Sequence, residues 1–279
     1  MKRTMRRGAW TLALLATHGL AMAAVDENAA RELTKKSGLW SQLASIGTQV
    51  QAGLDSAAQQ AHDKLEPEQR RRLASCTQGA FAAEPMRVVA VQTVAGALAA
   101  ADLPALQGWY DSATGRKVSA LEEAAGALTG DPRERLRLGS ETLAAASAAR
   151  RAALQAVLDN TASPQRMVDT MVEVTLAVQQ GFHSAAPDVP GPSADELRAM
   201  LERQRPQLTA RYTEILRALF ASTYAGLDDA ELQRYADFLH TSAGTSFNDA
   251  AMRGMVRALR GGAVQMGRCV QDARSTHGS

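Results

Sequence analysis

Residues 39–54 read LWSQLASIGTQVQAGL, a stretch in which apolar side chains recur at regular intervals. The intervals are four, three, four and four residues, and the positions are Leu39, Leu43, Ile46, Val50 and Leu54. Apolar residues at these intervals lie on one face of an α-helix. The stretch therefore predicts a long amphipathic helix whose apolar face packs against the rest of the protein.

A second stretch, residues 167–182, repeats this pattern at an offset of 128 residues and reads MVDTMVEVTLAVQQGF. Residues 172–178 alternate like a β-strand when they are taken alone. The positions that are apolar in both stretches nevertheless have helical spacing, namely Leu39/Met167, Leu43/Met171, Ile46/Val174, Val50/Val178 and Leu54/Phe182. Because the two stretches share only the helical pattern, we predict a helix here as well.

Two further segments match at an offset of 129 residues. Residues 102–118 read DLPALQGWYDSATGRKV, and residues 231–247 read ELQRYADFLHTSAGTSF. The anchors of this repeated motif pair as Trp109/Phe238 and Gly115/Gly244. We predict a short helix in each copy, ended or kinked at the glycine, and a longer helix after it. We expect the two aromatic anchors to be buried at equivalent positions and to serve packing.

These repeats, together with a composition rich in helix-forming residues and only 4% aromatic, predict an all-α fold. We expect two tandem helical repeat units that form a helical bundle and superpose over about 39–121 and 167–250. The predicted division is 1–23 signal peptide, 24–130 first repeat unit, 131–162 bridging helix and 163–279 second repeat unit. Further local signals are a helix start at Pro67, a capping box at Ser193–Glu196 and a kink or early stop at Gly261–Gly262.

The second motif resembles a family of bacterial exported proteins known as domain of unknown function 2059. The shared pattern is an acidic residue, Leu, an aromatic residue, a small polar residue and a Gly that opens the next helix. Counted twice, the resemblance covers nearly the whole chain after the leader. The first copy departs from the aromatic-rich pattern at Pro104 and Gly108. The resemblance implies an all-α exported protein and supplies no activity.

The first 23 residues have the features of a secretory signal peptide. Basic residues precede an apolar stretch at 9–16, and Ala21-Met22-Ala23 forms a small-residue cleavage site. The apolar stretch is shorter than the roughly 20 residues that a membrane span needs. We therefore expect cleavage near Ala23, a periplasmic or secreted protein, and no transmembrane anchor in the mature chain.

The charge balance gives no indication of nucleic-acid binding. The chain has 31 Lys and Arg against 29 Asp and Glu, and four of the basic residues lie in the expected leader. Clusters such as Arg70–Arg72 and Arg150–Arg151 are expected on solvated helix faces. Because no basic stripe with aromatic or groove-reading motifs is present, we expect no nucleic-acid partner.

Sequence motifs of known catalytic or metal sites are missing. The four histidines after the leader do not lie at metal-ligand spacing, and the chain has no phosphate-binding glycine loop and no nucleophile elbow. In the second motif, Ser112, Thr241, Ser242 and His240 do not form a base–orienter pair that repeats between the copies. We expect no catalytic, metal or cofactor site, which leaves an enzyme of unfamiliar type as the least favoured alternative.

Cys76 and Cys269 are the only cysteines. Neither falls on a repeated position, and an exported protein meets an oxidising compartment. We predict a disulfide between them that ties the first unit to the C-terminal helix. The alternative is two buried, reduced thiols that act as small apolar residues.

Two functions remain open from the sequence, and the sequence favours the first. The first is a non-catalytic interaction module that binds a protein or envelope component through a groove between the repeats. The second is a carrier of a small apolar or lipid-like ligand held between the helices. A continuous apolar cavity of several hundred cubic ångströms would favour the carrier, and an exposed apolar groove would favour the interaction module.

Overall fold

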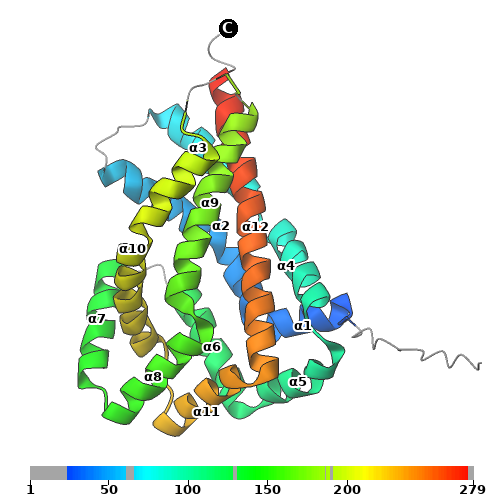
Figure 1. Ribbon diagram of the computed structural model, residues 1–279, viewed down its shortest axis with the longest axis vertical. Helices are drawn as coiled ribbons and strands as arrows, with labels where there is room; N and C mark the ends of the chain where they lie inside the picture. Colours follow the sequence, from blue (N-terminus) through cyan, green and yellow to red (C-terminus); the bar gives the residue numbers. More distant parts are fainter. Residues whose placement is uncertain (1–23, 61–65, 128–130, 186, 189–190, 276–279) are drawn as a thin grey trace, which may run out of the picture.

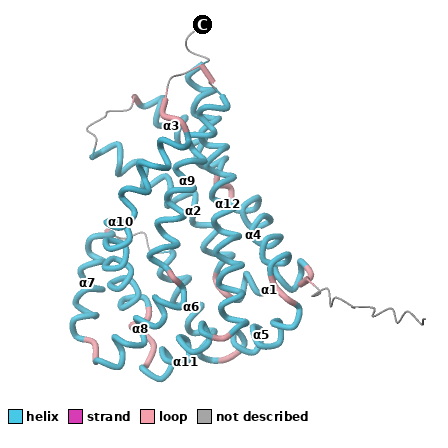
Figure 2. The backbone as a smooth tube through the Cα atoms, in the orientation of Figure 1, coloured by secondary structure: helices cyan, strands magenta, loops and turns pink. Residues whose placement is uncertain are grey.

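All regular secondary structure in the described part of the chain is helical, and Figure 2 shows helices joined by short loops. The computed structural model describes residues 24–60, 66–127, 131–185, 187–188 and 191–275. The predicted signal peptide lies outside these residues. The all-α fold class is confirmed.

The helices pack around two long neighbours, α9 and α12, which run side by side through the molecule (Figure 1). In chain order the elements are α1 (Glu27–Lys36), α2 (Leu39–Gln60), α3 (Pro67–Ala80), α4 (Ala83–Ala97), the 3-10 turn η1 (Ala100–Asp102), α5 (Leu103–Asp111), α6 (Ala113–Ala127), α7 (Pro132–Ala145), α8 (Ala148–Thr161), α9 (Ser163–Ala185), α10 (Ala194–Thr223), α11 (Asp229–His240) and α12 (Ser242–Ser275).

Several helices begin where the sequence predicts. Pro67 occupies the first turn of α3, where a backbone N–H would have no acceptor within the helix, so its lack of an N–H costs no hydrogen bond. The Ser193 hydroxyl and the Glu196 carboxylate form the predicted capping box of α10. Asp131 caps α7 by accepting a hydrogen bond from the backbone N–H of Arg133.

The predicted bridging helix at 131–162 is wrong as a single helix, because the structure divides it into α7 and α8. The α7 helix ends at Ala145, and Ser147 caps the start of α8. The Ser147 hydroxyl accepts a hydrogen bond of 3.0 Å from the backbone N–H of Arg150. A serine in an extended conformation that satisfies such a donor is a strong helix start, so the chain turns here.

Glycines let neighbouring helices approach α12 closely. Gly181 of α9 meets Gly267 of α12, and a Cβ on either would lie 2.9 Å from the other's Cα. Gly262 faces Phe81, whose ring would clash with any added Cβ. The expected kink or stop at Gly261–Gly262 is wrong, because α12 continues through both residues. Gly262 instead makes room for an aromatic side chain.

The two repeated stripes in α2 and α9 are buried differently. Val50 and Val178 pack against the same core cluster, which includes Leu43. Leu39 is 4% exposed, whereas its counterpart Met167 is 41% exposed. The α9 helix also buries a second face against α10, formed by Val168, Val172 and Leu176. Superposable repeat units therefore stay a prediction.

The repeated motif has a defined geometry in its first copy. The α5 helix ends at Asp111, and the Ser112 hydroxyl donates a hydrogen bond of 2.6 Å to the carbonyl oxygen of Trp109. The same hydroxyl accepts a bond of 2.9 Å from the backbone N–H of Gly115. A Cβ on Gly115 would lie only 2.1 Å from the Trp109 carbonyl oxygen. Only glycine fits this joint.

The second copy has the same joint between α11 and α12. The Thr241 hydroxyl donates to the carbonyl oxygen of Phe238 at 2.7 Å and accepts from the N–H of Gly244 at 3.0 Å. A Cβ on Gly244 would again lie 2.1 Å from the aromatic residue's carbonyl oxygen. The glycines therefore open the second helix of each pair, and they do so in the same way in both copies.

We predict that Gly115→Ala and Gly244→Ala each destabilise the protein by about 1–3 kcal/mol, because the added methyl group clashes with a fixed backbone carbonyl. Gly108→Ala is the control in the same motif, since no atom lies within 4 Å of its added Cβ. It should be neutral or stabilise by about 0.5–1 kcal/mol. Urea denaturation of the three variants measures these effects, and equal behaviour of all three would contradict the joint described above.

Cys76 of α3 and Cys269 of α12 form a disulfide, with their Cα atoms 5.7 Å apart. The bond closes a separation of 193 residues and joins α3 to the C-terminal half of α12. The predicted pairing is confirmed in the structure. It ties two elements that also pack directly on each other.

We predict that reducing the disulfide, or the double change Cys76→Ser with Cys269→Ser, lowers the free energy of unfolding by up to about 5 kcal/mol. The physical reason is the entropy that the unfolded chain regains when a loop of this length is opened. Urea unfolding with and without reductant measures the difference, and the reductant should leave the double variant unchanged. Two free thiols titrated in the unfolded, non-reduced protein would contradict the bond.

Candidate functional site

A pocket of about 350 Å³ lies where the two copies of the repeated motif meet. Its walls come mainly from α5, α6, α10, α11 and α12, in the lower half of Figure 1. The whole chain has three Trp, four Tyr and five Phe, and seven of these twelve residues line the pocket. They are Trp109, Tyr110, Phe220, Tyr224, Tyr235, Phe238 and Phe247. A chain poor in aromatic residues therefore concentrates them at one place.

The two aromatic anchors of the motif face each other in this wall. The rings of Trp109 and Phe238 stack with centroids 4.4 Å apart and planes 7° from parallel. Tyr235 lies nearly parallel to Trp109 at 5.9 Å, and Tyr110 meets Phe238 edge-on at 6.0 Å. Trp109 and Phe238 are half-buried rather than fully buried, because both line the pocket. The expectation that both are buried is therefore wrong, although both pack against core clusters as expected.

Glu122 of α6 places a carboxyl group among these rings. The hydroxyls of Tyr224 and Tyr235 each donate a hydrogen bond of 2.7 Å to the same atom, Glu122 Oε1. No residue of the described chain donates a hydrogen bond to Oε2 or forms a salt bridge with this carboxyl group. Burial raises the pKa of Glu122, and the two phenolic hydrogen bonds oppose that shift.

The surrounding tyrosines act as neutral hydrogen-bond donors. Burial, followed by the negative charge of Glu122, raises the pKa of Tyr110, Tyr224 and Tyr235 well above the usual value. Tyr224 is only 3% exposed and Tyr235 is 8% exposed. The hydroxyls of Tyr224 and Tyr235 consequently stay protonated at physiological pH. Both hydroxyls donate to the same carboxylate oxygen of Glu122, Oε1.

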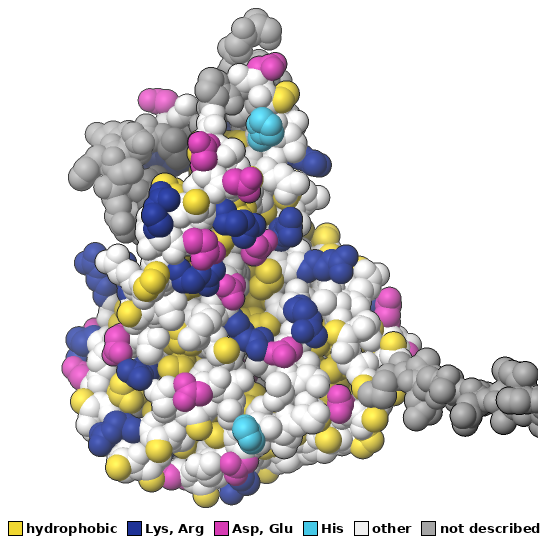
Figure 3. All heavy atoms as spheres, viewed as in Figure 1, with side chains coloured by type: hydrophobic (Ala, Val, Ile, Leu, Met, Phe, Trp, Pro, Cys, Tyr) yellow, Lys and Arg dark blue, Asp and Glu magenta, His cyan; other side chains and the backbone are white. Residues whose placement is uncertain are grey.

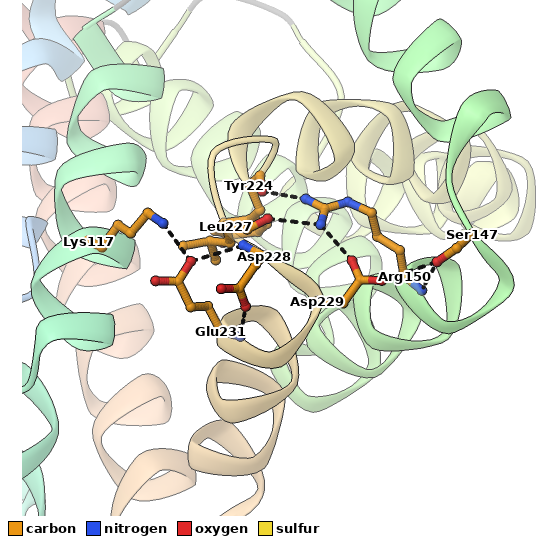
Figure 4. Close-up of polar contacts among 8 residues, drawn as sticks. All are labelled: Lys117, Ser147, Arg150, Tyr224, Leu227, Asp228, Asp229 and Glu231. Carbon is orange, nitrogen blue, oxygen red and sulfur yellow. Dashed lines mark hydrogen bonds and ion pairs between the residues drawn. The ribbon is translucent and has the colours of Figure 1, made fainter.

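An arginine holds the turn that carries Tyr224. Figure 4 shows the guanidinium of Arg150 directed at two carbonyl oxygens of the segment between α10 and α11 and at the side chain of Asp229, the first residue of α11. It donates to the carbonyl oxygens of Tyr224 at 2.7 Å and Leu227 at 2.9 Å, and to the carboxylate of Asp229 at 2.9 Å. The expectation that Arg150 lies on a solvated face is wrong, since its side chain is 14% exposed.

A second set of charges positions α11, which carries Tyr235. Asp228 accepts a hydrogen bond from the N–H of Glu231, and Glu231 accepts one from the N–H of Asp228, so the pair forms a capping box. Lys117 of α6 pairs with the Glu231 carboxylate at 2.5 Å (Figure 4). This ion pair links the helix of Glu122 to the helix of Tyr235.

One more polar group lines the pocket without a partner. Asn248 Nδ2 of α12 is buried and has no hydrogen-bond acceptor among the described residues. Most buried donors in folded proteins find an acceptor, and of the four buried side-chain atoms without a partner in the described residues only Asn248 Nδ2 belongs to a residue that lines the pocket. The pocket therefore presents both an acceptor, Glu122 Oε2, and a donor that the protein leaves unmatched.

The structure brings together only part of what the sequence singles out. Trp109, Phe238 and Gly244 line the pocket, and Gly115 forms the joint behind it. Cys76 and Cys269 do not line the pocket. Sequence reasoning missed Glu122, because Glu122 and Glu123 are neighbours on a helix, diverge by about 100° and are poorly placed to act as a carboxylate pair. Helical periodicity could have found it, since Glu122 lies four residues after Val118, a buried residue of α6.

No three His, Cys, Asp or Glu side chains in the described residues come together as a metal site would require. Within the same part of the chain, no helix has both the length and the hydropathy of a membrane span. No protein-family model, no curated protein and no solved structure matches the chain. The resemblance to domain of unknown function 2059 therefore stays a prediction.

We predict that Glu122→Gln raises the melting temperature at pH 8 and has a smaller effect near pH 4. The folded-state pKa of Glu122 is raised, so protonation favours folding, and the wild-type protein loses stability as the pH rises through that pKa. A glutamine keeps an acceptor for the two tyrosines without a charge. Glu123→Gln controls for the loss of one negative charge from α6. A Glu122→Gln protein that is less stable than wild type at pH 8 would contradict this burial argument.

Proposed function

We propose that this protein binds and carries a small ligand with an apolar, aromatic-sized body in the pocket between the two motif copies. The observation that supports this most is the convergence of seven aromatic residues on one pocket in a chain that has twelve. Core packing alone would close such a space, because protein interiors are normally filled to crystal-like density.

The volume of the pocket limits the size of the ligand. Ligand pockets usually measure about 300–1,000 Å³, so 350 Å³ lies near the lower end. An engineered apolar cavity of about 150 Å³ is known to bind benzene. A single aromatic ring with a short side chain, or a fused pair of rings, fits this volume better than a long lipid does.

The interaction module is the second candidate, and it has less support. Large apolar side chains that are well exposed in the described part come from four different helices: Val88, Leu138, Met167 and Met200. Figure 3 shows basic and acidic side chains interspersed on the face viewed. On α9, Glu173 lies 3.5 Å from both Arg198 and Arg260, so charges there bridge three helices. Nothing comparable to the aromatic pocket supports partner binding.

We further propose a periplasmic or secreted location, after removal of a leader near Ala23. The disulfide between Cys76 and Cys269 supports this, since such bonds persist in oxidising compartments and are rare in reducing ones.

Among the described residues that line the pocket, Glu122 is the only one with a carboxyl group, and this suits a carrier that has no catalytic step.

We predict that filling the pocket abolishes ligand binding without unfolding the protein. Ala251 lines the pocket and is half-buried, so Ala251→Phe should occupy the space that a ligand needs. Ala144→Phe is the matched control on an exposed position of α7. Indole and 1-naphthol serve as neutral aromatic probes, followed by saturation-transfer NMR and by the shift in melting temperature.

Both probes should bind the wild-type protein and the Ala144→Phe variant, and neither should bind Ala251→Phe. Native mass spectrometry of protein purified from its own cells adds an independent readout, because a resident ligand would appear as a fixed mass increment. Equal binding by Ala251→Phe, or no binding of any probe at millimolar concentration, would contradict the carrier function.

A further inference from the structure

We propose that the ligand of the pocket carries an amine or alkylammonium group, and that Glu122 is its counter-ion within a cage of aromatic side chains. This inference rests on the proposed carrier function and names the chemical class of the ligand. It follows from three features of the pocket: the unpaired carboxyl group, the aromatic faces around it and the absence of other charges among the lining residues.

The carboxyl group of Glu122 has hydrogen-bond donors at only one of its two oxygens. Tyr224 and Tyr235 both donate to Oε1, which leaves Oε2 without a donor in the described residues. Glu122 is half-buried and lines the pocket, so its carboxylate loses part of its hydration, and the two phenolic hydrogen bonds replace that hydration at Oε1 only. An ammonium group at Oε2 would supply both the charge and the missing hydrogen-bond donor, at the distance of a charge-assisted bond.

The aromatic walls suit a cation as well. Rings attract a positive charge through their electron-rich faces, and tight recognition of ammonium groups commonly uses several rings at once. Tyr224 and Tyr235 meet edge-to-face at 5.5 Å, with the Glu122 carboxyl bonded to both hydroxyls. Tyr110 lies edge-on to Phe247 at 5.5 Å in the same wall. These rings line the same pocket as the Glu122 carboxyl group, so a ligand cation paired with Glu122 would lie among aromatic side chains.

The charges of the lining residues select against an anion. Glu122 is the only Asp, Glu, Lys, Arg or His among the described residues that line the pocket. An anionic ligand would face this carboxyl group and find no basic side chain there to balance it. The titratable groups that face Glu122 are the neutral phenols of Tyr110, Tyr224 and Tyr235. The pocket is therefore complementary to one positive charge.

The unpaired amide of Asn248 indicates that the ligand carries a second polar atom. Its buried Nδ2 lacks an acceptor in the described chain and lines the same pocket. An oxygen on the ligand would satisfy this donor, as the amine satisfies Glu122. An aromatic amine that also carries a hydroxyl group would match both unmatched groups of the protein.

The experiment compares probes of equal size and different charge on the full chain. The probes are 2-phenylethylamine, the neutral 2-phenylethanol and the anionic phenylacetate, and their affinities are measured by calorimetry at pH 7.5. We expect the amine to bind the wild-type protein at least tenfold more tightly than the alcohol, and phenylacetate to bind most weakly. The amine's advantage should shrink as the pH falls and Glu122 takes up a proton.

Glu122→Gln is the deciding variant, and Glu123→Gln on the same helix is its control. Glu123 does not line the pocket, and it accepts a hydrogen bond from Ser41 at 3.0 Å. Glu122→Gln should lose the preference for the amine over 2-phenylethanol, and a cooperative thermal melt reports that the variant is folded. Glu123→Gln should keep the wild-type order of affinities.

The outcomes separate this inference from the proposed function. If 2-phenylethanol or phenylacetate binds the wild-type protein as tightly as the amine, the carrier function stands and the amine class is wrong. An unchanged preference in Glu122→Gln would likewise overturn the role of Glu122. If no probe binds, and indole and 1-naphthol also fail, both the carrier function and its ligand class are wrong.

Discussion

The close contact at Gly181 and Gly267 joins α9 and α12, the two helices against which α3, α4 and α10 pack. A Cβ on Gly267 would lie 2.4 Å from the Val178 carbonyl oxygen, so the two backbones touch and neither helix can shift without a clash. The same half of α12 receives Phe81 at Gly262 and the disulfide at Cys269. The other half of α12, which contains Gly244 and Met255, lines the pocket.

The duplicated joint explains why a pocket forms at the far end of α12. In each copy a Ser or Thr hydroxyl bonds the carbonyl of the aromatic anchor, and a glycine lets the next helix start directly against that carbonyl. The two joints thereby present Trp109 and Phe238 to each other as a stacked pair. The two joints therefore determine where the stacked rings lie in the wall of the pocket.

The sequence predicts the helices better than their arrangement. Periodicity and capping residues identify α2, α3, α9 and α10, because these signals are local. The break at Ser147 was missed, since a mid-segment Ser can be a cap or a solvated side chain and only tertiary packing decides. The disulfide pairing was predictable because two isolated cysteines leave one choice. Glu122 was not predictable, because its hydrogen-bond partners Tyr224 and Tyr235 lie about a hundred residues later and only the fold brings them to it.

The chemical identity of Glu122 is a second reason, beside the aromatic lining, to see the pocket as more than a packing defect. A glutamine could accept the same two phenolic hydrogen bonds with no charge to desolvate, so stability alone favours the amide. Burial instead raises the pKa of the Glu122 carboxyl group, and no described residue donates a hydrogen bond to its Oε2 atom. Sites that bind ligands commonly keep such locally unfavourable groups, because a ligand of opposite charge recovers the lost free energy on binding. Arg150 and Lys117 fit this view. Their side chains bind the turn that carries Tyr224 and the helix that carries Tyr235. Neither residue lines the pocket, so neither neutralises Glu122.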